Sequence, residues 1–250
     1  MWGVIVIGYS TINTLRAQDI EIGHWLWAGQ SPTDVGASQS RLMDRCSELE
    51  LTCRHSNLKI LVRSWTGGEA SVSIKHHTPR VLSKGASVIL SYRLEYLVND
   101  KEVGAIIRRD INIWRRAGRP VTGIEIDFDS PSTRLEGYRK WLVRIQGQLP
   151  DDISLNITGL PSWFEDDRKG AKKLARSVRE VSLMFYRQEQ TPITQHLLAA
   201  INNIQNLRYA FLCDDMRWKA LIRETEKNET FRMAIFLISR CNDVGKSAPS

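Results

Sequence analysis

The sequence lacks any apolar run near the roughly 18 residues that a membrane-spanning helix needs. Proline is scarce, with 8 among 250 residues, and there is neither an internal repeat nor a low-complexity segment. Hydrophobic residues make up 42% of the chain, which is enough for a sizeable core. These features exclude disordered, collagen-like and polytopic membrane proteins, and they favour a globular fold.

Familiar chemical motifs are also missing. There is no Gly-x-Gly-x-x-Gly, Walker loop or Gly-x-Ser-x-Gly elbow. The four cysteines form no Cys-x-x-Cys pair and have no histidine at zinc-finger spacing. They are free thiols or, in an exported chain, one or two disulfides, with Cys46–Cys53 the more local pair. We interpret Asp214-Asp215 as a solvated turn rather than a divalent-metal site, and we predict no metal and no cofactor.

Basic residues outnumber acidic ones by 35 to 28, a net charge of +7 that favours polyanionic neighbours. The basic clusters at 108–119 and 172–179 lie opposite apolar helical stripes, and few aromatic residues interleave with them. We interpret both clusters as solvated outer faces and predict no nucleic-acid partner. His76-His77 is likewise interpreted as surface.

The amino-terminal residues resemble an export signal. A short apolar segment at 3–9 is followed by Leu15-Arg16-Ala17, which offers a small residue at a cleavage point. We therefore predict a signal peptide at 1–17, a single domain at 18–250, and a periplasmic or secreted mature protein without a membrane span. The alternative is a buried first strand at 3–9.

Eight short β-like segments alternate with helical patterns. The strands are predicted at 24–27, 58–63, 87–94, 121–129, 153–158, 181–186, 207–213 and 231–239. Helices are predicted between them at 42–49, 78–85, 99–117, 133–150, 171–178, 193–204 and 216–227, and Thr133-x-x-Glu136 is a capping-box pattern. Strict alternation predicts an α/β fold, a (β/α)8 TIM-like barrel with short or irregular helices. An open doubly wound sheet is the alternative.

The most informative segment is Thr122–Asp129, TGIEIDFD. Because side chains alternate along a strand, Ile124, Ile126 and Phe128 face one way, while Glu125, Asp127 and Asp129 face the other. In a barrel, the apolar face meets the helices and the carboxylates face inward. Carboxylates this close raise one another's pKa, which suits general acid catalysis. A solvated acidic edge, or acids held in pairs with arginines, is the alternative.

Further polar and aromatic residues lie at or just past the carboxyl ends of predicted strands, where barrel active sites form. Arg63, Arg93 and Arg187 could neutralise the acids or bind a charged substrate. Trp27, Trp65 and Trp163 could form stacking surfaces for sugar rings, although a tryptophan at a strand end more often packs at the rim.

Two segments resemble a known family. Gly123–Asp129 with Ser130-Pro131, and Leu155–Trp163 (LNITGLPSW), look like the motifs of the bacterial domain of unknown function 3142. With the tryptophans near residue 25, the resemblance extends over residues 24–240. It implies an exported protein with a barrel related to glycoside hydrolases.

A more distant resemblance is to the family 18 chitinase-like glycoside hydrolases. Their Asp-Gly-x-Asp-x-Asp-x-Glu motif aligns with 122–129, with Asp129 in place of the catalytic Glu, and their Met-x-Tyr-Asp aligns with Met184–Arg187, with Arg187 in place of Asp. The resemblance implies that Asp129 is the proton donor, that Asp127 orients a substrate acetamido group and that Tyr186 hydrogen-bonds that group. Asp129 is a methylene shorter than the family's Glu, and Arg187 reverses the charge of the family's Asp, so the sequence departs from the chitinase pattern at both positions.

The sequence as a whole predicts a glycoside hydrolase-like protein that acts on a carbohydrate polymer. Asp127, Asp129 and Tyr186 are the expected catalytic residues. The expected substrate-binding residues are Trp27, Trp163, Arg93, Glu125 and Arg187. A non-catalytic glycan-binding or cell-envelope protein on the same scaffold is the alternative, and a metal-dependent phosphodiesterase ranks third.

Overall fold

The computed structural model describes residues 20–31, 43–44, 47, 53–55, 58–67, 72–82, 87–185, 193–201, 204–211 and 234–237. Their strands are β1 (Ile20–Leu26), β2 (Cys53–His55), β3 (Leu58–Thr66), β4 (Val72–Lys75), β5 (Val88–Leu94), β6 (Val121–Phe128), β7 (Ser154–Gly159), β8 (Glu180–Met184), β9 (Leu207–Phe211) and β10 (Ala234–Leu237). Their α-helices are α2 (Asp100–Arg116), α3 (Leu135–Gln146), α4 (Ser162–Asp166), α5 (Arg168–Ala175) and α6 (Gln195–Ile201).

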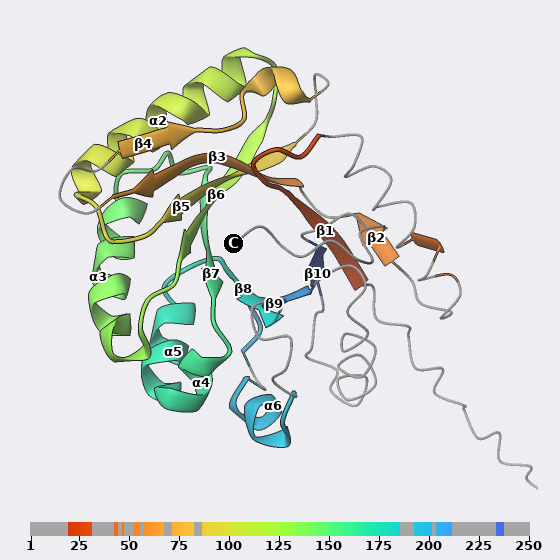
Figure 1. Ribbon diagram of the computed structural model, residues 1–250, viewed down its shortest axis with the longest axis vertical. Helices are drawn as coiled ribbons and strands as arrows, with labels where there is room; N and C mark the ends of the chain where they lie inside the picture. Colours follow the sequence, from red (N-terminus) through yellow and green to blue (C-terminus); the bar gives the residue numbers. More distant parts are fainter. Residues whose placement is uncertain are drawn as a thin grey trace, which may run out of the picture.

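The strands form one curled sheet in the order β2-β1-β10-β9-β8-β7-β6-β5-β3-β4. Neighbouring strands run parallel, except for the antiparallel pair β3–β4. β1 also pairs with β3 through Trp25–Lys59 and Leu26–Ile60. The chain is therefore a mixed α/β fold with parallel strands in a curled half-barrel, and α2, α3, α4 and α5 lie along the outside of the curl (Figure 1).

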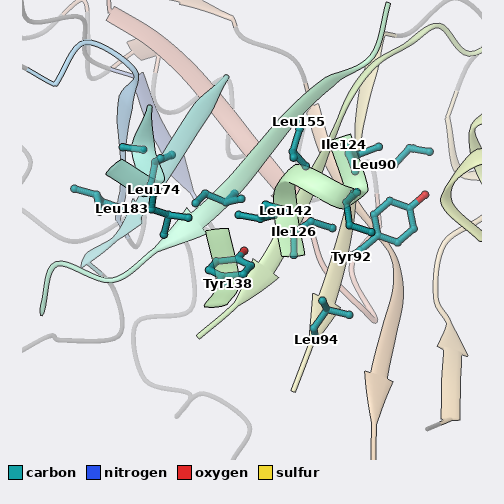
Figure 2. Packing of buried hydrophobic residues seen from close by; sticks show 14 of the residues in the cluster. Leu90, Tyr92, Leu94, Ile124, Ile126, Tyr138, Leu142, Leu155, Leu174 and Leu183 are labelled. Carbon is teal, nitrogen blue, oxygen red and sulfur yellow. The ribbon is translucent and has the colours of Figure 1, made fainter. Parts of the chain in front are cut away.

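The main core fills the space between the outer face of the sheet and these helices. Leu90 of β5 and Ile124 and Ile126 of β6 are fully buried there. They belong to the same cluster as Tyr138 and Leu142 of α3, and Figure 2 shows these side chains close together. Hydrophobic periods of two in the strands and 3.6 in the helices thus meet in one apolar layer.

Local sequence signals account for the ends of α2. The Asn99 side chain accepts hydrogen bonds from the backbone amides of Lys101 and Glu102, which caps the first turn. At the other end, Gly118 follows with a φ of 73°, the left-handed conformation that glycine adopts without strain. The predicted helix at 99–117 is confirmed to within one residue at each end.

Three local predictions were wrong or incomplete. The predicted capping box does not form, because Ser132–Arg134 is a 3-10 turn and α3 begins only at Leu135. The weakly patterned segment at 64–77 contains β4, which sequence periodicity missed. The segment at 78–85 forms only a 3-10 turn, Pro79–Val81, over its described residues.

Arg63 lies on the opposite face from the one predicted. A register irregularity between Leu61 and Arg63 reverses the alternation along β3, so Arg63 points toward α2. Its guanidinium pairs with both oxygens of the buried Asp110 carboxylate, at 2.5 and 3.0 Å. Arg63 therefore joins the sheet to a helix and is not available to a ligand on the inner face.

The described part of the chain contains no helix long and apolar enough to span a membrane. The predicted signal peptide at 1–17, the helix at 216–227 and the pairs Tyr186-Arg187 and Asp214-Asp215 lie outside the described residues. Of the predicted helix at 42–49, only Met43, Asp44 and Ser47 are described.

Replacing Asp110 with Asn should leave the Arg63 cation buried without a counter-charge. Breaking a buried ion pair from one side costs about 3–5 kcal/mol. We expect the free energy of unfolding, measured by urea denaturation, to fall by about this amount. Asp152→Asn is the matched control, because Asp152 is largely exposed in its pair with Arg115. Equal stability of the two variants would contradict the prediction.

Candidate functional site

The predicted alternation along β6 is confirmed. Ile124 and Ile126 lie in the core, whereas Glu125 and Asp127 face the concave side of the sheet among polar residues from neighbouring strands. Both carboxylates are almost completely buried, with 0% and 1% of the residue exposed. Asp129 comes just after the strand, and 28% of its side chain is exposed. The three acids are therefore in different environments.

Glu125 lies in the inner ion cluster, which consists of Trp25, Lys59, Ser91, Glu125 and Ser182. Its carboxylate accepts hydrogen bonds from the Lys59 ammonium, from Trp25 Nε1 at 2.6 Å and from Ser182 Oγ at 3.3 Å. Lys59 also donates to Ser182 Oγ at 2.6 Å and lies over the Trp25 ring, 5.1 Å from its centroid. Glu125 and Lys59 have no exposed surface, so we assign this cluster a supporting role.

Asp127 lies in the strand-end cluster, which consists of Arg93, Asp127, Asp129 and Thr158. Arg93 Nη1 donates to one Asp127 oxygen at 2.7 Å, and Thr158 Oγ1 donates to the other at 2.8 Å. Strand register explains the first contact, because Arg93 of β5 is paired directly with Asp127 of β6. The second guanidinium nitrogen of Arg93 is 3.8 Å from Asp129.

Pairing of acids with cations was the alternative interpretation of the acidic strand, and all three carboxylates lie within ion-pair distance of a cation. Lys59 neutralises Glu125, and Arg93 neutralises Asp127. Asp129 lies 3.8 Å from Arg93, and its side chain is partly exposed, at 28%. It is therefore the carboxyl group best placed for proton transfer to a bound molecule.

Sequence reasoning missed the two histidines, which it assigned to the surface. His76 and His77 follow β4 and are half-buried. His76 Nε2 lies 2.9 Å from Ser64 Oγ, and Ser64 is paired in register with Arg93. His77 Nε2 donates to the Trp27 carbonyl oxygen at 2.7 Å. No sequence pattern could have placed them here, because β4 is the strand that periodicity failed to show.

The three predicted stacking tryptophans lie in different environments. Trp27 is partly exposed at the end of β1, beside Trp25. Trp163 is 1% exposed, donates from Nε1 to the Ser130 carbonyl oxygen at 2.6 Å and packs edge-on against Tyr138. Trp65 is buried against Tyr92. Only Trp27 among the three presents surface to a ligand in this structure.

Neither cluster has the composition of a metal centre. Among the described residues, no three His, Cys, Asp or Glu side chains gather as a bound ion would require. The strand-end cluster instead places one exposed carboxyl, one guanidinium and one hydroxyl at the ends of β5, β6 and β7. Proton donation, charge stabilisation and hydrogen bonding to hydroxyl groups are within its chemistry.

Comparison with known proteins supports the resemblance seen in the sequence. Residues 85–187 match the model of a family described as Domain of unknown function (DUF3142). This segment contains β5 to β8, both predicted motifs and the whole strand-end cluster. It is shorter than the 24–240 range over which the resemblance was expected. Among proteins with curated descriptions, none matches this sequence.

Solved structures resemble this chain, and two with TM-scores above 0.5 show the likeness in fold. A family 18 chitinase from Crocus vernus is 10% identical, with 87% of this chain and 92% of that chain covered and a TM-score of 0.51. The xylanase-A-amylase inhibitor protein XAIP-III is 11% identical, with 88% and 93% covered and a TM-score of 0.55. The spore cortex-lytic enzyme SleL from Bacillus cereus is 14% identical, with 78% and 51% covered and a TM-score of 0.47, so this chain spans about half of it. At such identities the likeness concerns the fold, and in that sense the expected similarity to family 18 is confirmed.

Replacing Lys59 with Met should leave the buried Glu125 carboxylate without its cationic partner. We expect a loss of about 3–5 kcal/mol in the free energy of unfolding, since one partner of a buried pair has been removed. Lys59→Met combined with Glu125→Gln should recover much of this loss, because Glu180, the other partner of Lys59, keeps its pair with Arg208. Lys173→Met, at an exposed lysine, is the control. A double variant no more stable than Lys59→Met would contradict this account.

Burial, with a smaller contribution from neighbouring His77, lowers the pKa of His76 below its ordinary value of 6.5. At a pH between the lowered pKa of His76 in the folded state and 6.5, its pKa in the unfolded state, the folded state binds fewer protons than the unfolded state. The contribution of His76 to stability is therefore complete above pH 6.5 and is lost as the pH falls below it. NMR titration of the imidazole should give a pKa below 6.5, and the variant His76→Asn should show less destabilisation on acidification. A pKa of 6.5 or above would contradict this.

Proposed function

We propose that this protein is a glycoside hydrolase-like protein that acts on a carbohydrate polymer at the carboxyl ends of its strands. Asp129 is the general acid, and Asp127 is its ionised electrostatic partner. Arg93 and Trp27 contact the sugar, while Glu125 supports the site from beneath. Tyr186 and Arg187 come two and three residues after the end of β8 in the sequence. We propose for them the positioning and substrate-binding roles that the family resemblance implies.

The observation that carries this proposal is the separation of environments between Asp127 and Asp129. Asp127 is buried, and a guanidinium and a hydroxyl hold its two oxygens in place. Asp129, two residues later, is the exposed member. Glycoside hydrolysis uses two carboxyl groups in different roles: an ionised carboxylate stabilises charge, and a second carboxyl group donates a proton to the ligand.

The fold supports the proposal by the place it gives to the strand-end cluster, not by the chemistry of individual residues. We propose that the curl completes an eight-stranded (β/α)8 barrel, with the two-residue pairing of β1 and β3 as its seam. In such barrels active sites lie at the carboxyl ends of the strands, where the strand-end cluster lies. Export to the periplasm or beyond the cell would bring the protein to envelope polysaccharides.

A non-catalytic glycan-binding protein is the second candidate, and one feature favours it. Aspartate is a methylene shorter than glutamate, so its carboxyl lies more than an ångström from where the family's proton donor would reach, and misplacement of this order costs about a hundredfold in rate. One protein of similar fold bears the name of an inhibitor. The arginine, the exposed tryptophan and the histidines would serve binding equally well.

Asp129→Asn should separate the two candidates. We expect hydrolysis of the best polysaccharide in a panel of envelope, N-acetylated and non-acetylated polymers to fall by about 10²–10⁴, the usual contribution of a general acid. Glycan binding should change little, because asparagine keeps the shape. Asp152→Asn, at an exposed aspartate away from the cluster, should leave the rate unchanged.

Three results would alter the proposal. A wild-type protein that binds a glycan but cleaves none would leave the binding role and remove the catalytic one. Full activity in Asp129→Asn would remove Asp129 as the acid. The absence of both binding and cleavage would remove carbohydrate action altogether.

A further inference from the structure

We infer that Arg93, and not Asp127, is the residue that contacts the sugar substituents and determines which are accepted. The site therefore does not require an N-acetyl group on its substrate. The inference rests on the proposed function, and it names the class of sugar that the site accepts. It departs from the role that the family resemblance implies for Asp127, which is to orient a substrate acetamido group.

Exposure separates the two partners of this ion pair. The Asp127 side chain has no exposed surface, whereas 31% of the Arg93 side chain and 28% of the Asp129 side chain are exposed. A ligand that approaches the strand ends therefore meets the guanidinium and the outer carboxyl group. It reaches Asp127 only if Arg93 moves away.

Both oxygens of Asp127 also have donors from the protein itself. Arg93 Nη1 and Thr158 Oγ1 lie at 2.7 and 2.8 Å, and Thr158 is itself fully buried. A hydrogen bond from a guanidinium to a carboxylate is among the stronger ones in proteins. Displacing Arg93 would leave a buried negative charge with one neutral donor, which is unfavourable.

The chemistry of the exposed partner then determines which substituents fit. A guanidinium carries only donors, so an acetamido group can meet Arg93 through its carbonyl oxygen but not through its N–H. Hydroxyl oxygens accept hydrogen bonds from a guanidinium and can also donate to a carboxylate. Arg93 and Asp129 therefore accept a sugar that presents only hydroxyl groups. An acetamido group is not required, because its N–H cannot reach the covered Asp127 carboxylate.

Two series of oligosaccharides test this, because cello-oligosaccharides and chitin oligosaccharides share one linkage and differ in the substituent at carbon 2. Calorimetry should show that the wild-type protein binds the non-acetylated series at least as tightly as the acetylated series of equal length. Tighter binding of the acetylated series by tenfold or more would overturn the inference while leaving the proposed function intact. Binding of neither series would overturn the inference, while the polysaccharide panel described above decides the proposed function.

Arg93→Met uncovers Asp127 and should change the preference. We expect the ratio of affinities to shift toward the acetylated series by about tenfold or more, the effect of one hydrogen bond to a charged group. Arg144→Met, at an exposed arginine on α3, should leave the ratio unchanged. An unchanged ratio in Arg93→Met, with folding verified by circular dichroism, would overturn the inference. The wild-type ratio decides the question should that variant fail to fold.

Discussion

Alternation of side chains along β6 places charge on one side of the sheet and hydrocarbon on the other, and the remaining structure depends on this division. Ile124 and Ile126 pack against α3, while Glu125 and Asp127 face polar neighbours. A slip of one residue would move both carboxylates into the apolar layer. Because a buried charge without a partner costs several kcal/mol, the pairing register has little freedom.

Charge on the inner face creates a second constraint, since the interior of such sheets is more often filled with branched apolar residues. The protein meets this constraint with cations from neighbouring strands, Lys59 for Glu125 and Arg93 for Asp127. Buried ion pairs are weak evidence for stability, because apolar replacements are often as stable. Two stacked pairs beneath an exposed aspartate are better explained as support for a site.

Much of the fold could be predicted from the residues because periodicity reports the environment of each element. All eight predicted strands are present, and the acidic strand faces the side that its alternation indicated. The predicted face of Arg63 was wrong because a single register irregularity in β3 reverses which side chains face inward from that point on. No feature of the amino-acid composition marks this irregularity. His76 was missed because its position depends on β4, four residues that pair with β3 through backbone hydrogen bonds.

The same limitation explains why the roles of the carboxylates were not separable from the sequence. Glu125, Asp127 and Asp129 are equivalent in spacing, and spacing predicts only that they face the same way. Their differences come from other strands: a lysine on β3, an arginine on β5 and a threonine on β7 each pair with one of the two deeper acids. Asp129 differs from both in its partial exposure, and it lies where the family 18 motif has its longer acid. The role proposed for Asp129 rests on this difference.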